Sequence, residues 1–238
     1  LWRDYEQRSR ADAETFVVAD DSRTPAKRLT MHGQFVSGPR FAPAACDECA
    51  AEIIYAARNP DTFPEMRRIG ADGGGDRRLT LRFLGETVGV QAPYLVFDQQ
   101  EFRRNVGLYS DLYRLDRRTG DVRALTREQR LMDPDVATDG RIVAVRQRQD
   151  RRELVLVPPA LRADSGIPTE AITVIASAAD EQFSVPKWSP DGRTVAVERR
   201  RLGALPDLVI VDVATRAVRL LAADPAARIV TPAWRPDG

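Results

Sequence analysis

The sequence predicts an all-β protein, a β-propeller built from repeated four-stranded blades, with a short helix before the repeats. Three observations support this prediction: recurring windows, turn signatures that precede them, and apolar runs of strand length only. The windows cover residues 65–80, 111–126 and 207–222, so their starts lie 46 and 96 residues apart, and 96 is two steps of 48. Periods of this size are typical of propeller blades.

Each window has an alternating apolar run, a short turn rich in Gly, Asp or Thr, and a second run that ends in Leu-Thr or Leu-Ala. This pattern is typical of a β-hairpin. A second strand–turn–strand element precedes the hairpins. In its turns, Pro presets φ, Asp bonds the backbone two residues on, and Gly accepts a positive φ. The turn residues that mark the repeat are Asp139, Gly140, Trp188, Ser189, Pro190, Asp191, Gly192, Trp234, Pro236, Asp237 and Gly238.

In chain order, these elements predict four units, at about residues 33–80, 81–126, 127–176 and 177–222, with a fifth begun at 223. Loops absorb variation in length at little cost, which accommodates the long stretch at 158–169 in the third unit. Arg28–Thr30 has the ending of a fourth strand, and we expect it to pair with the blade begun near Ile229. The chain reads as part of a longer protein.

The turn Trp188–Gly192 followed by the 207–222 hairpin resembles the WD40-like (PD40) repeat of TolB-type β-propellers. The resemblance covers about residues 24–238 and implies a disc with a central channel, six-bladed when complete, of which about four full blades lie here. It also implies protein recognition in the bacterial periplasm. The same repeat is similar to the one in N-terminal propellers of prolyl-oligopeptidase-type serine peptidases.

Residues 1–19 do not fit the repeat and are predicted to be helical, because they are rich in charge and contain no Gly or Pro. We therefore expect two parts: 1–22 as the helical tail of a preceding domain or a linker, and 23–238 as an incomplete TolB-like propeller. The layout is similar to bacterial proteins that place such a propeller after a zinc metallopeptidase-like domain.

Charge, aromatic content and hydropathy argue against a nucleic-acid partner and against a membrane-spanning segment. The chain has 36 Lys and Arg against 35 Asp and Glu, a net charge of +1, and aromatic residues make up 7%. Neither a global field nor a stacking surface for nucleic acid is expected. No apolar run reaches the 18 or more residues of a membrane span, so none is predicted.

Catalytic, cofactor-binding and metal-binding residues are not expected. His32 is the single histidine, so the H-E-x-x-H zinc motif is impossible, and no G-x-S-x-G nucleophile elbow occurs. We interpret His32 as a surface or loop residue. Asp133, Asp135 and Asp139 depart from calcium-loop spacing, and the repeat explains Asp139 as part of a turn.

Cys46 and Cys49 are interpreted as a structural pair, either a small disulfide or two reduced thiols. A zinc site needs a second pair of ligands, and a thioredoxin-like motif needs a strand-to-helix setting; both are missing. Trp188 and Trp234 occupy equivalent repeat positions, which favours packing between blades over ligand stacking.

The sequence therefore predicts a non-catalytic propeller that binds a protein or peptide partner, within a larger bacterial envelope or secreted protein that carries a covalently linked neighbouring domain. The alternative is an accessory propeller of a peptidase, prolyl-oligopeptidase-like or zinc metallopeptidase-linked, which gates or positions substrate.

Overall fold

The computed structural model describes residues 2–18, 27–103, 106–161, 166–235 and 237–238, and the chain divides into two compact units, Leu1–Met31 and His32–Gly238. In the first unit, α1 (Trp2–Val18) is the helix expected before the repeats. The expected boundary between residues 22 and 23 lies outside the described residues and stays a prediction. Across the described ranges, no helix combines the length and apolar character that a membrane crossing requires.

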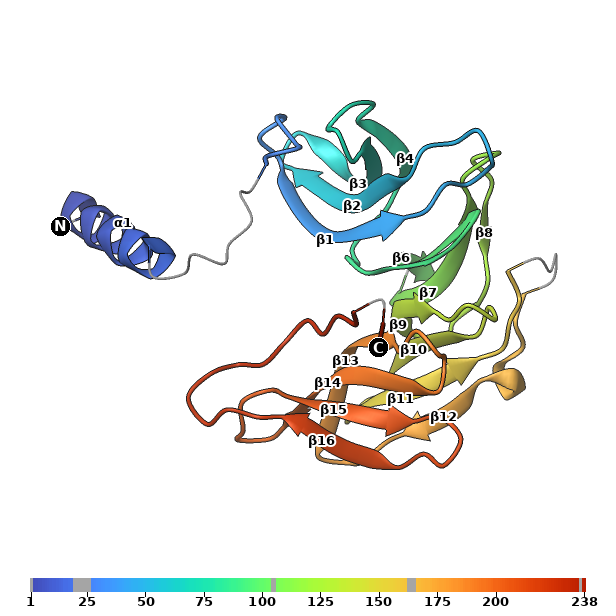
Figure 1. Ribbon diagram of the computed structural model, residues 1–238. Coiled ribbons are helices and arrows are strands. Elements are labelled where there is room, and N and C mark those ends of the chain that lie inside the picture. Colours follow the sequence, from blue (N-terminus) through green and yellow to red (C-terminus); the bar gives the residue numbers. More distant parts are fainter. Residues whose placement is uncertain (1, 19–26, 104–105, 162–165, 236) are drawn as a thin grey trace. The chain divides into compact units, whose positions relative to one another are not determined.

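The second unit contains four successive blades, each with four antiparallel strands side by side in sequence order (Figure 1). Blade 1 comprises β1 (Phe35–Ala42), β2 (Glu52–Asn59), β3 (Thr62–Gly70) and β4 (Arg77–Leu81); blade 2 comprises β5 (Val88–Gln91), β6 (Tyr94–Arg103), β7 (Gly107–Asp116) and β8 (Val122–Ala124). Blade 3 comprises β9 (Leu131–Val136), β10 (Ile142–Gln147), β11 (Arg152–Val157) and β12 (Thr173–Ala176); blade 4 comprises β13 (Glu181–Trp188), β14 (Thr194–Arg201), β15 (Asp207–Asp212) and β16 (Val218–Ala222).

The four predicted units are confirmed as four-stranded blades, and the three recurring windows are the hairpins of third and fourth strands, β3–β4, β7–β8 and β15–β16. A short 3-10 helix, Thr169–Ala171, lies in the long loop of the third unit. One parallel pairing, between Arg152 and Gln182, also joins blades 3 and 4. The total of six blades stays a prediction.

The strand expected at Arg28–Thr30 is wrong, because residues 27–34 contain no strand. An outer strand is held by ladder hydrogen bonds to a third strand, and no described strand pairs with this segment. The begun fifth unit likewise has no strand at 223–235.

Apolar layers between successive blades form the core. Ile54 and Met66 of blade 1 pack with Leu95 and Phe97 of blade 2, and all four are fully buried. Equivalent layers join blades 2 and 3 and blades 3 and 4. Full burial of one such side chain contributes about 1.5–3 kcal/mol, so these layers hold the blades together.

A repeated bulge shapes the innermost strands. In β1, β9 and β13, Gly38, Asp133 and Val185 have φ values of 57°, 53° and 48°, and each precedes a proline. Thr231, which lies outside any strand, repeats the feature with a φ of 55° before Pro232. The residue before proline is disfavoured in the right-handed helical region, and a bulge re-aims the side chain that follows. In blades 1, 3 and 4 the residue after that proline is charged, and these three residues meet, as described below.

A buried carboxylate recurs in the third strand of each blade: Glu65, Asp111, Glu153 and Asp207 are all less than a tenth exposed. Three of them pair with arginines of their own blade, and Asp111 accepts hydrogen bonds from the backbone nitrogens of residues 128 and 129. Buried charges persist in folded proteins when they are paired in this way.

Candidate functional site

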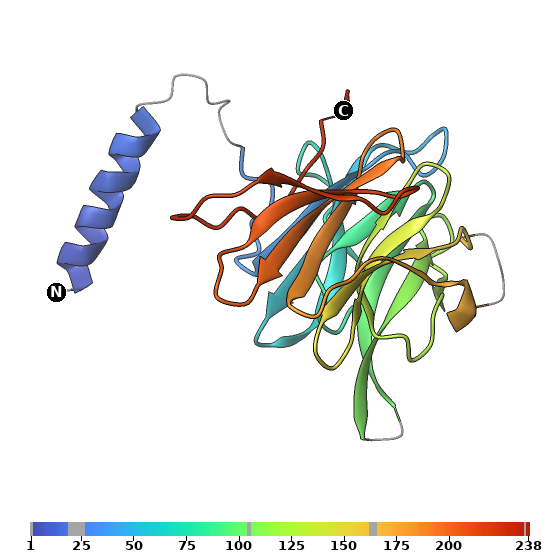
Figure 2. The same cartoon turned by 90° about the horizontal axis from the view of Figure 1, so that it is seen from below.

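The two ends of the blades differ in composition. Successive loops of an antiparallel sheet lie at opposite ends, so the hairpins between second and third strands share one end with the connections between blades. We call this end the hairpin face, and the opposite end the turn face. In Figure 2 the β6–β7 hairpin of blade 2 projects well beyond the other blades.

Exposed large apolar side chains gather toward the hairpin face. Val106 and Leu202, in two of its hairpins, are 90% and 95% exposed. The other exposed apolar residues near this end include Phe35, Phe63, Phe102, Leu108 and Leu205, against Phe41, Val122 and Val218 toward the turn face. Apolar side chains that cluster at one end of a molecule are typical of an interaction surface.

Two adjoining cavities open on the hairpin face of blades 3 and 4. Cavity A, of about 460 Å³, is lined by residues 128–130 and 147–151. Cavity B, of about 440 Å³, is lined by Asp150, Gln182 and residues 179–180 and 200–203. Asp150 lines both, so the two cavities adjoin at this residue, and we call them together the concave region; the exposed Leu202 lies in the wall of cavity B.

Arginines dominate the charge around these cavities. Among the exposed charged side chains of the lining segments and the adjacent residue 127, five are arginines and three are acids. The arginines are Arg127, Arg130, Arg148, Arg200 and Arg201, and the acids are Glu128, Asp150 and Asp180. The guanidinium of Arg130 lies 4.9 Å from the centroid of the Tyr109 ring. The cavities therefore present cations at their rim.

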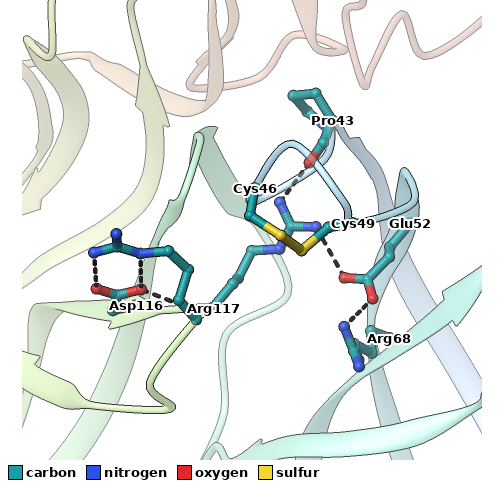
Figure 3. Close-up of a disulfide and its surroundings, with 8 residues drawn as sticks. Pro43, Cys46, Cys49, Glu52, Arg68, Asp116 and Arg117 are labelled. Carbon is teal, nitrogen blue, oxygen red and sulfur yellow. Dashed lines mark hydrogen bonds and ion pairs between the residues drawn. A yellow bond between two sulfur atoms is a disulfide. The ribbon is translucent and has the colours of Figure 1, made fainter.

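The turn face is braced by ion pairs and a disulfide (Figure 3). Cys46 and Cys49 are disulfide-bonded, with an S–S distance of 2.08 Å, in the loop between β1 and β2. Arg117 of blade 2, whose side chain is 1% exposed, donates to the Pro43 carbonyl at 2.6 Å and to Glu52 Oε2 at 2.9 Å. Arg117 thus fastens blade 2 to the loop that the disulfide closes.

A further cavity of about 340 Å³ lies on the turn face between blades 2 and 3, lined by Gln91, Ala92, Tyr94 and residues 139–140 and 159–161. At the same end, a hydrogen bond from Arg118 lowers the pKa of Asp116. Arg117, Asp116 and the loop that contains Cys46 and Cys49 are held by contacts among the turns of this face, which suits a structural role.

The innermost strands meet at Asp135. Its Oδ1 accepts a hydrogen bond from Arg40 Nη2 at 2.8 Å and lies 3.7 Å from Lys187 Nζ, while its Oδ2 accepts from the Trp188 backbone nitrogen at 2.9 Å. Burial, and to a smaller extent the charge of Arg40, lowers the pKa of Lys187 against the opposing effect of Asp135. These residues tie blades 1, 3 and 4 together.

The repeat-signature residues lie in turns and blade contacts. Trp188 is 6% exposed in the apolar layer between blades 3 and 4, with the Arg141 guanidinium 4.9 Å from its ring centroid. Ser189, Asp191 and Gly192 close the turn after it, and Asp139 and Gly140 form the equivalent turn of blade 3. Trp234 donates to the Lys187 carbonyl at 3.0 Å. Pro190 is exposed in the same turn as Asp191, Asp237 and Gly238 are exposed near the chain end, and Pro236 lies outside the described residues.

His32 is part of a hydrogen-bonded chain on blade 1. Its Nδ1 accepts from the Gln34 backbone nitrogen at 3.1 Å, and its Nε2 lies 3.2 Å from the Tyr55 hydroxyl. That hydroxyl donates to Asp76 at 2.8 Å, and burial followed by this hydrogen bond raises the pKa of Tyr55 to about 12. Among its described partners, His32 has no serine or cysteine, so the arrangement is not that of a nucleophilic triad.

The three aspartates weighed as calcium ligands, Asp133, Asp135 and Asp139, make different contacts. Asp133 and Asp135 accept hydrogen bonds from backbone nitrogens of β13, whereas Asp139 pairs with Arg141. No group of three or more His, Cys, Asp or Glu side chains suited to a metal ion occurs in the part of the chain that the structure describes.

Comparison with solved structures identifies the fold. TolB from Acinetobacter baumannii superposes with a TM-score of 0.64 at 17% identity, over 84% of this chain and 46% of that one. A putative TolB from Agrobacterium tumefaciens gives 0.57 at 13% identity, over 82% and 83%. A puromycin-hydrolyzing peptidase from Mycobacterium tuberculosis gives 0.55 at 15% identity, over 82% and 29%.

The chain thus spans a little under half the length of the Acinetobacter protein. No protein-family model and no curated protein matches the sequence. At these identities the likeness establishes the fold alone.

Proposed function

Because the repeats fold as a TolB-like β-propeller, we propose that the chain is a non-catalytic binding module that takes a protein or peptide partner on its hairpin face. One observation carries the proposal: exposed apolar side chains and the two adjoining cavities occur together at this end of the blades. Concave surfaces with apolar anchors and a polar rim are typical of recognition sites.

The structural contacts of the turn face support this assignment. Arg117, Glu52 and the disulfide loop are engaged with one another there, so a partner on that face would compete with contacts between blades. On the hairpin face Leu202 and Val106 are almost fully exposed, so covering them would release water at no structural cost.

A second candidate is an accessory propeller of a peptidase, prolyl-oligopeptidase-like or zinc metallopeptidase-linked. The similarity to the Mycobacterium tuberculosis peptidase favours it. In this role the blades would gate or position substrate for a catalytic domain joined to the chain, and the hairpin face would exclude molecules by size instead of binding one sequence.

We place the protein in the bacterial periplasm or outside the cell. The disulfide between Cys46 and Cys49 supports this placement, because disulfides persist in oxidising compartments and are rare in the cytosol.

Panning a random peptide library over the immobilised chain tests the proposal. We expect enriched peptides with micromolar affinity, and we expect Leu202→Ser or Phe102→Ser to weaken their binding about tenfold, which corresponds to roughly 1.4 kcal/mol for a buried apolar anchor. Phe41→Ser, at a side chain 64% exposed toward the turn face, is the matched control and should leave the affinity unchanged.

The outcomes separate the candidates. Weakening by Phe41→Ser alone would move the site to the turn face and contradict the proposal. If panning enriches no sequence and the chain excludes large peptides by size, the accessory propeller of a peptidase would be favoured. Cleavage of an enriched peptide by the purified chain would contradict both.

A further inference from the structure

We infer that the concave region formed by cavities A and B selects an acidic peptide segment that carries an apolar side chain. The inference rests on the proposed function and adds the chemistry of the partner. It follows from the arginines that remain free around the cavities and from the position of Leu202.

Several arginines at this site are free for a ligand. No described carboxylate lies within ion-pair distance of Arg127, Arg130 or Arg200, and all three are exposed. Arg130 is oriented by its stacking on Tyr109, which reduces the conformational entropy it loses when it binds a carboxylate. A planar guanidinium takes a carboxylate through two parallel hydrogen bonds.

Other arginines beneath the rim are already paired. Glu153, at the start of β11, binds Arg146 at 2.8 Å, and Asp207, at the start of β15, binds Arg199 at 2.9 Å. These ion pairs neutralise the buried carboxylates of Glu153 and Asp207 beneath the exposed arginines. Among the described side chains at this site that are exposed and without an ion pair, three are arginines (Arg127, Arg130 and Arg200) and two are acids (Glu128 and Asp180), so the net unpaired charge at the rim is positive.

Leu202 supplies the apolar part of the site. It is 95% exposed in the wall of cavity B, next to Arg200 and Arg201 in sequence. A ligand that alternates carboxylates with apolar side chains can pair with the arginines and cover Leu202 at once.

A peptide fits this site better than a nucleic acid. Asp180 stands in the wall of cavity B among the arginines, where it would repel a phosphate backbone, which carries a charge at every step, more than a peptide whose carboxylates alternate with apolar side chains. The residues that line the two cavities include no aromatic side chain, whereas single-stranded nucleic acid is usually bound by stacking on such rings.

Fluorescence anisotropy with three labelled ten-residue peptides tests the inference. The peptides alternate leucine with aspartate, asparagine or lysine, and they are titrated with the chain at low salt. We expect the aspartate peptide to bind at least tenfold more tightly than the other two, and its affinity to fall as sodium chloride is raised, because screening weakens exposed ion pairs.

Paired variants locate the binding. Arg130→Glu with Arg200→Glu should weaken the aspartate peptide at least tenfold. Arg193→Glu, at a side chain 84% exposed on the turn face, is the matched control and should change the affinity less than twofold. Circular dichroism melts verify that the variants fold, and the salt dependence of the unaltered chain needs no variant.

Equal binding of the asparagine peptide, an equal effect of Arg193→Glu, or equally tight binding of a ten-nucleotide oligothymidylate would overturn the inference. If panned peptides still need Leu202 and Phe102 but ignore the arginine reversals, this inference fails while the proposed function stands. If no peptide depends on any hairpin-face residue, both fail.

Discussion

Replacing Asp135 with alanine is expected to destabilise the fold strongly, because this carboxylate joins three blades. Its side chain is 5% exposed and that of Lys187 is 9% exposed, so water cannot replace the lost acceptor. Breaking a buried ion pair by removing one partner costs about 3–5 kcal/mol, since the other charge stays buried without compensation. The Trp188 backbone nitrogen would lose its acceptor as well. We therefore expect the free energy of unfolding to fall by about 3–5 kcal/mol.

Urea unfolding followed by tryptophan fluorescence measures this change, because Trp188 lies beside the site. Replacing Lys187 with methionine in the same chain removes the more buried of the two cations that lose their partner, the other being Arg40, so the double variant should be more stable than Asp135→Ala alone. Asp61→Ala, in an exposed turn, is the control and should cost less than about 0.5 kcal/mol. A loss below about 1 kcal/mol for Asp135→Ala, or a double variant less stable than the single one, would refute the reasoning.

Three further variants test other parts of the fold. Burial raises the pKa of Glu153, but hydrogen bonds from neighbouring arginines lower it by more, so the pKa lies below its usual value of 4.5. Glu153 therefore stabilises the fold above that pH, and this stabilisation is lost as the pH falls through the lowered pKa. Glu153→Gln should make thermal stability less dependent on pH in that acidic range, and an unchanged slope would contradict this assignment. Replacing Cys46 and Cys49 with serine should cost at most about 2 kcal/mol, as expected for so short a loop, without loss of peptide binding in anisotropy. Gly38→Ala should cost more than Gly75→Ala in urea melts, because both have a positive φ but only at Gly38 would a Cβ collide with a backbone oxygen, that of Glu86; equal costs would count against that close approach.

The blades could be predicted from the sequence because their hairpins repeat in residue type and spacing. The third unit showed no such window, since the long loop at 158–172 separates its third strand from its fourth. Its third strand nevertheless carries the same signal, because an acid followed by leucine stands at Glu153 as it does at Asp111 and Asp207. That dipeptide marks the recurring buried carboxylate in three of the four blades, whereas Glu65 is followed by methionine.

The hairpin face could not be predicted in the same way. Alternation of apolar residues shows which side of a strand faces a neighbouring blade, but it does not show where the strand extends past that blade. Phe102 and Leu108 continue the pattern of β6 and β7 and yet are 70% and 44% exposed. The meeting of Arg40 and Lys187 at Asp135 depends on bulges before three prolines, and their combined effect appears only when the blades are assembled.

Hydrogen exchange measured by mass spectrometry, with and without a panned peptide, tests the binding surface most directly. The account predicts slower exchange in the bound state at residues 127–130, 147–151 and 200–206, with unchanged exchange in the loop that contains Cys46 and Cys49. Protection confined to that loop and to the turns at 137–141 and 189–193 would contradict the assignment of the hairpin face.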